Sequence, residues 1–178
     1  MLARLSGADL ERLMDSIGTP TFVVSVKNAD DFIVLYGNRE LQKILGVSPG
    51  SMRNQPSGSI IPREQAYIFR HYYHQCWLEG EPVMFETTLT VPVGERGLRI
   101  TLNPVRDDAG AVVRMLGTVL DVTEERQAQE ALRYQHLLLR AQQDLSPDGI
   151  MIADVNGATL SWNTRFRELW GLTDAELR

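Results

Sequence analysis

The sequence predicts an α+β fold, and three observations point to it. Short runs of β-branched and aromatic residues fall into two groups, a pair near the N-terminus and a set of three further on. The segment between the groups has helical spacing and helix-ending glycines. Within each group the runs are separated by Gly, Asn and Asp clusters, which are typical of antiparallel hairpins.

An amphipathic helix is predicted within residues 1–18. Ser6 is a capping residue, and Leu10, Leu13, Met14 and Ile17 follow it at the spacing of one helix face. Two uses of this face remain open. It pairs with a second copy of the chain in a parallel homodimer, or it covers the chain's own sheet.

The first pair of runs, residues 22–26 and 32–36, predicts a hairpin with a polar turn between them. A short helix should then begin at Asn38 and end at Gly46. Residues 48–59 contain Pro and Gly throughout, so they are expected to form a loop with at most one helical turn.

The next helix is predicted to begin at Pro62 and end before Gly80. Three strands should follow, over residues 83–91, 98–105 and 111–122, with hairpin turns between them. Residues 124–145 contain neither Gly nor Pro and predict one linker helix. Its heptad seam consists of Gln127, Ala131, Tyr134, Leu138, Ala141 and Leu145.

The chain contains an internal repeat. The segment from Asn38 to Gly46 resembles the segment from Asn163 to Gly171, 125 residues later. Upstream, the match aligns Pro20 with Asp148, with three fewer residues in the following turn of the second copy. We therefore expect four parts: an N-terminal cap helix (1–18), a complete domain (19–123), a linker helix (124–145) and the start of a second domain (146–178).

Composition narrows the class of protein. A net charge of −5 without a run of Lys and Arg argues against nucleic-acid binding. The longest apolar runs have five residues, too few for a membrane span in this segment. A single cysteine, Cys76, cannot form an intrachain disulfide, which suits the cytoplasm. Neither a nucleophile-elbow motif nor a phosphate loop is present, so we expect no catalysis in this chain.

These motifs resemble the PAS family of sensory domains. The resemblance rests on Asn38 to Gly46 and its copy, on Gly80-Glu-Pro, and on the closing run from Gly117 to Glu124. It implies a five-stranded antiparallel sheet in the order 2-1-5-4-3 and a pocket between the sheet and the long helix. It also implies a bacterial signalling protein, such as one of a two-component system, whose output domain would be a histidine kinase, a diguanylate cyclase or a transcription regulator.

Alternation along the middle strand directs three residues, Leu98, Ile100 and Leu102, toward the core. The helix after Pro62 presents an aromatic face toward them. We expect the ligand pocket to be lined by Phe69, Tyr72, Tyr73, Cys76, Leu98, Ile100, Leu102, Met115, Gly117 and Val119.

The resemblance argues against two cofactors and leaves the ligand unknown. Light-sensing flavin relatives carry an Asn-Cys-Arg motif after the short helix, and here that region has no cysteine. Haem-binding relatives place a histidine seven residues after the helix-opening proline, where this chain has Phe69. His71 and His74 are interpreted as exposed residues rather than metal ligands, and His136 as a solvent-facing linker residue.

Two hypotheses for function follow. In the first, the domain binds a small ligand or dimerises, and Asp121 and Thr123 couple the last strand to the linker helix and so to an output domain. In the second, the domain is a constitutive homodimerisation scaffold with a packed, ligand-free core. In both, the expected dimer interface contains Leu10, Leu13, Met14, Ile17 and Leu138.

Overall fold

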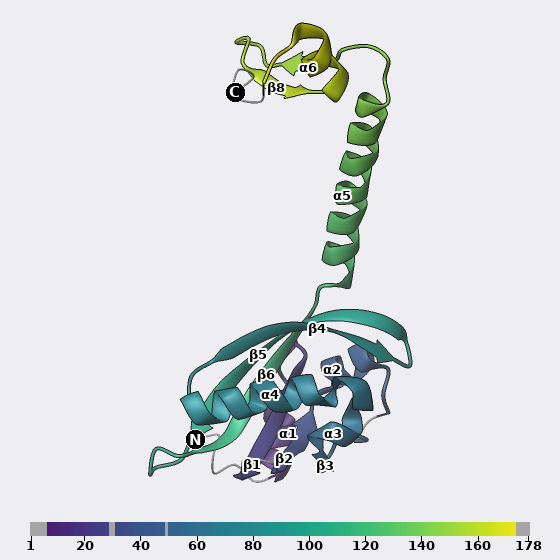
Figure 1. Cartoon of the computed structure of the whole chain (residues 1–178). Helices are drawn as coiled ribbons and strands as arrows, with labels where there is room; N and C mark the ends of the chain where they lie inside the picture. Colours follow the sequence, from purple (N-terminus) through teal and green to yellow (C-terminus); the bar gives the residue numbers. More distant parts are fainter. Residues whose placement is uncertain (1–6, 29–30, 49, 174–178) are drawn as a thin grey trace. The chain divides into compact units, whose positions relative to one another are not determined.

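The computed structural model describes residues 7–28, 31–48 and 50–173, which form two compact units that divide between Glu124 and Glu125 (Figure 1). The first unit contains the sheet and its covering helices. The second contains most of a long helix, a hairpin and a short helix. Each unit is described by itself below.

The sheet of the first unit is antiparallel, in the order β3-β2-β1-β6-β5-β4. Without β3 this is the predicted five-stranded order, which is confirmed. The sixth strand is two residues long and pairs with the edge of β2 (Ile33 with Pro56) within a region expected to be loop. The strands are β1 (Thr21–Asn28), β2 (Asp31–Gly37), β3 (Gln55–Pro56), β4 (Val83–Val91), β5 (Gly94–Arg106) and β6 (Val112–Asp121).

Three helices cover one face of this sheet: α2 (Arg39–Leu45), α3 (Ser57–Ile60) and α4 (Arg63–Glu79) (Figure 1). The predicted alternation along β5 is confirmed, because Leu98, Ile100 and Leu102 are at most 1% exposed and face these helices. The helix α4 buries Phe69, Tyr73 and Cys76 against them. The main core therefore lies between the sheet and α4.

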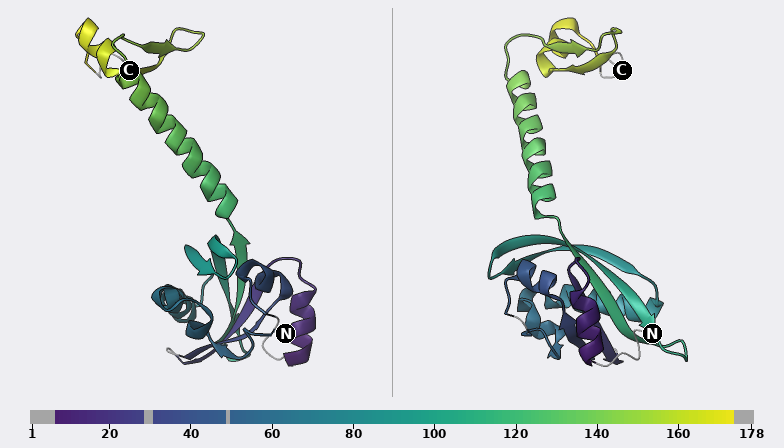
Figure 2. Two further views of the ribbon diagram at one scale, coloured as in Figure 1. Left: turned by 90° about the vertical axis from the view of Figure 1, so that its right-hand side faces the viewer. Right: turned by 180° about the vertical axis from the view of Figure 1, so that it is seen from behind.

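The helix α1 (Gly7–Asp15) lies on the opposite face of the sheet (Figure 2). Met14 is buried against Val23, and Ile17 packs beside them. The structure therefore shows α1 covering its own sheet, and Met14 is occupied there rather than free for a second copy. Leu13 is 44% exposed, whereas the side chain of Leu10 lies outside the described residues. A dimer contact through Leu13 stays a prediction.

The helix α5 (Thr123–Asp144) follows β6 and has no buried residue. In the second unit, β7 (Met151–Ala153), β8 (Thr159–Trp162) and α6 (Thr164–Trp170) repeat the order of β1, β2 and α2. Both short helices have an asparagine N-cap and end in a left-handed glycine, Gly46 or Gly171.

The structure shifts the upstream match of the repeat by one residue. The N–H groups of Thr21 and Ile150 donate to the side chains of Asn38 and Asn163 in the same way, so Thr21 corresponds to Ile150. This pair is 129 residues apart, against 125 for the asparagines, so the turn of the second copy is four residues shorter rather than three.

A close contact joins the two halves of the sheet. Gly117 of β6 pairs with Phe22 of β1, and a Cβ atom at Gly117 would lie 2.2 Å from the Phe22 ring. We predict that Gly117→Ala lowers the free energy of unfolding by about 1–3 kcal/mol, because the ring must move within a packed core. Urea denaturation measures the change. Gly18→Ala, whose Cβ meets nothing within 4 Å, is the matched control and should change stability by less than about 1 kcal/mol; equal effects would contradict the prediction.

Candidate ligand cavity and signalling junction

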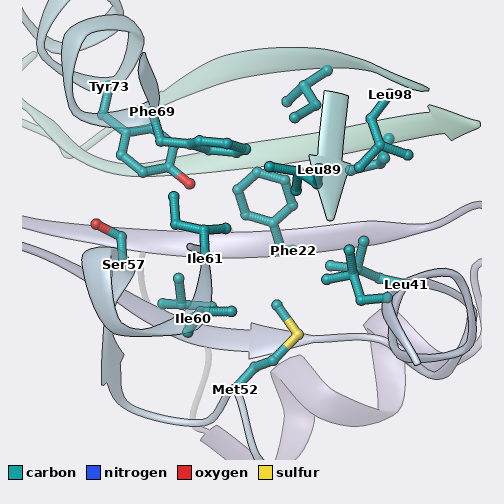
Figure 3. A pocket seen from close by; sticks show the side chains of 14 residues that line it. Phe22, Leu41, Met52, Ser57, Ile60, Ile61, Phe69, Tyr73, Leu89 and Leu98 are labelled. Atoms are coloured by element: carbon teal, nitrogen blue, oxygen red, sulfur yellow. The ribbon is translucent and has the colours of Figure 1, made fainter. Parts of the chain in front are cut away.

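A cavity of about 40 Å³ lies inside the first unit, between the sheet and the helices α2, α3 and α4 (Figure 3). Five of the predicted pocket residues line it: Phe69, Tyr73, Leu98, Ile100 and Val119. The sheet brings the last two together, because Ile100 and Val119 are direct partners across β5 and β6. One side of the cavity is therefore where the strand alternation placed it.

The other five predicted residues do not line the cavity. Leu102, Met115 and Gly117 face the same core, but they lie further along β5 and β6, where Phe22 covers Gly117. Tyr72 stacks on Phe85 of β4, with ring centroids 4.1 Å apart. The Cys76 thiol lies 3.9 Å from the Leu102 carbonyl oxygen, to which it donates. The cavity is shorter than the inward-facing strand pattern, so the pattern alone overestimated its extent.

The remaining lining residues lie on β1, β2, β4, α2 and the segment between α2 and α4, none of which was assigned to the pocket. Period-2 alternation in the first hairpin and the i, i+4 pair in α2 could have identified some of these residues. The region around α3 carries no periodic signal that would mark its inward-facing residues, and for that reason it was expected to be loop. The additional lining residues are Phe22, Val34, Leu41, Leu45, Met52, Ser57, Ile60, Ile61 and Leu89.

The cavity is apolar and carries no charged side chain among its lining residues. Figure 3 shows the phenol oxygen of Tyr73 pointing into it. Burial raises the pKa of Tyr73 well above that of an ordinary tyrosine, so the phenol is neutral at physiological pH. Ser57 contributes the other hydroxyl. Ser57 also borders an open cleft of about 410 Å³ that contains Arg70 and Tyr67, so it lies between the cavity and the surface.

The remaining candidate side chains are not placed for chemistry. Burial, with a smaller effect of Glu79, raises the pKa of Cys76 to about 11, so the thiol is protonated and unreactive. His71 is exposed and contacts Tyr72, and His74 is half-buried beside Trp77; neither lines the cavity. Within the described residues, no cluster of three or more His, Cys, Asp and Glu side chains could hold a metal ion.

The junction between β6 and α5 is held by Asp121 and Thr123. One carboxylate oxygen of Asp121 accepts from the Thr123 N–H at 3.0 Å and from the Thr123 hydroxyl. The Thr123 hydroxyl in turn accepts from the Gly97 N–H at 2.9 Å. Arg96 approaches the other Asp121 oxygen at 4.0 Å. The start of α5 is thus attached to the first residues of β5, and the contributions of Arg96 and Gly97 were not foreseen.

Comparison with known proteins identifies the class. Residues 14–127 match the family described as PAS fold, and residues 133–178 match the one described as PAS domain. The chain therefore belongs to the PAS family of sensory domains. It is similar to the sensor protein FixL of Bradyrhizobium diazoefficiens, with 30% identity over 97 residues, 54% of this chain and 19% of FixL. The chain thus spans about a fifth of that relative.

Solved structures show the same fold. An RNA-binding light-oxygen-voltage receptor matches with 21% identity and a TM-score of 0.56, over 79% of this chain and 39% of the receptor. The PAS domain of BvgS from Bordetella pertussis matches with 19% identity and a TM-score of 0.54, over 75% and 96%. Within the part of the chain that the structure describes, no helix has both the length and the apolar character needed to cross a membrane.

The raised pKa of Tyr73 predicts a loss of stability at high pH. Unfolded tyrosine titrates near pH ~10, whereas the folded phenol stays protonated, so the stability it confers is complete below that pH and is lost as the pH rises toward the folded pKa. We expect the free energy of unfolding to fall between about pH 10 and about pH 11, by up to about 1.4 kcal/mol per pH unit for this group.

Tyr73→Phe should reduce this slope in urea denaturation series. Tyr36, whose pKa is raised to about 12 by burial and by its bond to Asp15, contributes with the same sign and will leave part of the slope in place. Tyr67→Phe, at a side chain 69% exposed, is the control and should keep the full slope. If the slope were the same in all three proteins, the role of Tyr73 would be excluded.

Proposed function

We propose that the first unit is a non-catalytic sensor that binds a small, neutral, apolar molecule and passes the change to α5. The cavity is the observation that carries this proposal. A volume of about 40 Å³ is several times the ~10–15 Å³ that one water requires, but it is far too small for a flavin or a haem. The apolar lining offers no charge partner, so a charged ligand would be strongly disfavoured. The Tyr73 phenol supplies one hydrogen-bonding group.

A second candidate function is supported by the tight packing itself. The cavity is small relative to the ~300–1,000 Å³ of ordinary ligand sites. A core that stays closed to every ligand would make the unit a constitutive dimerisation scaffold. The two candidates differ in one measurable property, which is whether a probe of the right size enters the cavity.

The route from the cavity to α5 is short along β6. Val119 lines the cavity, and Asp121 holds the start of α5 two residues later. Binding that favours one position of β6 over another would shift the equilibrium at this junction by the difference in affinity. In this proposal α5 carries the shift toward an output domain of the kind found in sensor proteins.

The helix α5 is also the proposed dimer contact. Its apolar side chains Tyr134 and Leu138 are 63% and 46% exposed and share one face at heptad spacing, and Leu145, one residue after the helix ends, is 84% exposed and continues the same spacing. Arg133 and Arg140 lie away from this face by helical periodicity, and Glu130 flanks it, four residues before Tyr134. Pairing with the same helix of a second copy would remove this exposed stripe from water.

Xenon is a suitable probe of the cavity because it binds dry apolar cavities. We expect xenon to shift the methyl NMR signals of Leu98, Ile100 and Val119 in the wild type. Val119→Ile should abolish the shifts by filling the space, whereas Val113→Ile, half-buried on the same strand, should not. Absence of any xenon-dependent shift would reject the sensor in favour of the scaffold.

The dimer is tested by Leu138→Glu. Placing a charge on the apolar seam should weaken association by about tenfold or more, because the carboxylate must be desolvated between the helices. Analytical ultracentrifugation across a concentration series measures the effect. Gln129→Glu introduces the same side chain on the opposite face of α5 and should leave association unchanged. A wild-type protein that is monomeric at the highest concentrations would contradict the proposed dimer.

A further inference from the structure

The first unit contains a buried asparagine that ties the end of α1 to the hairpin and to α2. The Asn38 side chain is 0% exposed. Its oxygen accepts from the Thr21 and Leu41 N–H groups at 2.9 and 3.1 Å. Its amide donates to the carbonyl oxygens of Met14, Ile17 and Thr19, at 3.2, 3.1 and 2.9 Å.

An aspartate completes this arrangement. Asp15 is the last residue of α1, and its carboxylate accepts from the Arg39 N–H at 3.1 Å, at the first residue of α2. A helix end is therefore held by two side chains, Asp15 from the helix and Asn38 from the hairpin exit. These hydrogen bonds join three segments around the buried Asn38 side chain, with Asp15 on the exposed side.

The second unit repeats this arrangement with α5 in the place of α1. Asn163 is 1% exposed, accepts from the Ile150 and Phe166 N–H groups at 2.8 Å each, and donates to the Gln143 and Asp148 carbonyl oxygens at 2.6 and 2.9 Å. Asp144 is the last residue of α5, and it accepts from the Thr164 N–H at 3.0 Å.

The sequence distances match as well, and the hydrogen bonds correspond except that, among the residues that the structure describes, Asn163 has no counterpart of the bond from Asn38 to the Ile17 carbonyl oxygen. Met14 and Gln143, Asp15 and Asp144, and Thr19 and Asp148 are all 129 residues apart. We propose that Asp144 and Asn163 are positioning residues that form the input contact of the second unit, so that a movement of the end of α5 is delivered to the β7–β8 hairpin and α6.

This assignment gives α5 two defined ends. At its start, Thr123 is bonded to Asp121 and to Gly97 of β5. At its end, the last turn is bonded through Asp144 and Asn163 to the beginning of α6. The first contact is the exit of one sensory module and the second is the entrance of the next. The proposal goes beyond ligand binding and dimerisation, because it concerns only how the β7–β8 hairpin and α6 are joined to α5 within the second unit.

Two variants separate the parts of the contact. Asn163→Asp keeps the oxygen that caps α6 but removes the amide that donates to Gln143 and Asp148. Asp144→Ala removes the acceptor for the Thr164 N–H, whereas Asp144→Asn keeps an acceptor oxygen at that position. Glu168→Gln, which affects only an exposed ion pair with Arg165, is the control.

The experiment uses the full chain labelled with ¹⁵N in a weakly aligned medium. In the wild type, residual dipolar couplings from the last two turns of α5 and from β7, β8 and α6 should fit one common alignment frame. Asn163→Asp and Asp144→Ala should require two frames, while Asp144→Asn and Glu168→Gln keep one. Asp144→Ala should also speed amide exchange at Thr164 by about tenfold or more, because the bond to a charged acceptor is lost.

Amide protection of the β7–β8 pairs checks that each variant keeps its hairpin. If Asn163→Asp unfolds the hairpin, the comparison of Asp144→Ala with Asp144→Asn tests the proposal instead, because the Asp144 side chain lies on the exposed end of α5. Two frames in the wild type, or an Asp144→Ala protein with one frame and unchanged exchange at Thr164, would overturn the proposal. Neither result depends on xenon binding or on dimerisation, so failure here is distinguishable from failure of the sensor function.

Discussion

The pairing of β1 with β6 is the constraint on which the first unit depends. It joins the N-terminal hairpin to the three C-terminal strands, which are separated in sequence by α2, α3 and α4. Within this pairing the ring of Phe22 lies over Gly117, where a side chain would collide with it. Because this ring also lines the cavity, the same contact closes the sheet and sets one wall of the site.

In each unit one buried asparagine joins the hairpin to the neighbouring helices by hydrogen bonds. Asn38 and Asn163 are almost fully buried, yet each satisfies its amide and its oxygen with backbone groups. A buried polar group is tolerated when its partners are present and costs a few kcal/mol when they are not. Such a residue therefore specifies one arrangement of the helix end, the hairpin and the short helix, which an apolar residue would not.

The two units differ in how well they cover their apolar residues. In the first, Phe22 and Leu45 are 5% and 6% exposed. Their counterparts in the second, Met151 and Trp170, are 47% and 69% exposed, because no equivalent of α4 or of β4 to β6 covers that hairpin within the described residues. The second unit retains the hairpin, the short helix and the hydrogen bonds of the buried asparagine.

Most of the fold could be predicted from local sequence patterns. The strand runs, the caps at Asn38 and Gly46 and the repeat at Asn163 predicted most of the elements, because these signals arise from side-chain alternation and backbone geometry within a few residues. The strand order was implied by the resemblance to the PAS family. The local patterns also found one wall of the cavity, in Ile100 and Val119. The α3 region and the bonds of Asp15 and Asp144 gave no such signal, because they join segments distant in sequence.

The sequence by itself determined most of the elements and the existence of a duplicated module, and its resemblance to the PAS family implied the order of the strands. Its period of two or 3.6 residues specifies which face of an element is apolar. Only the tertiary structure decided that α1 covers its own sheet and that the cavity ends before Leu102. It also showed that a buried asparagine donates hydrogen bonds to the end of the helix that precedes each hairpin. These features depend on distances between segments far apart along the chain, which no local period encodes.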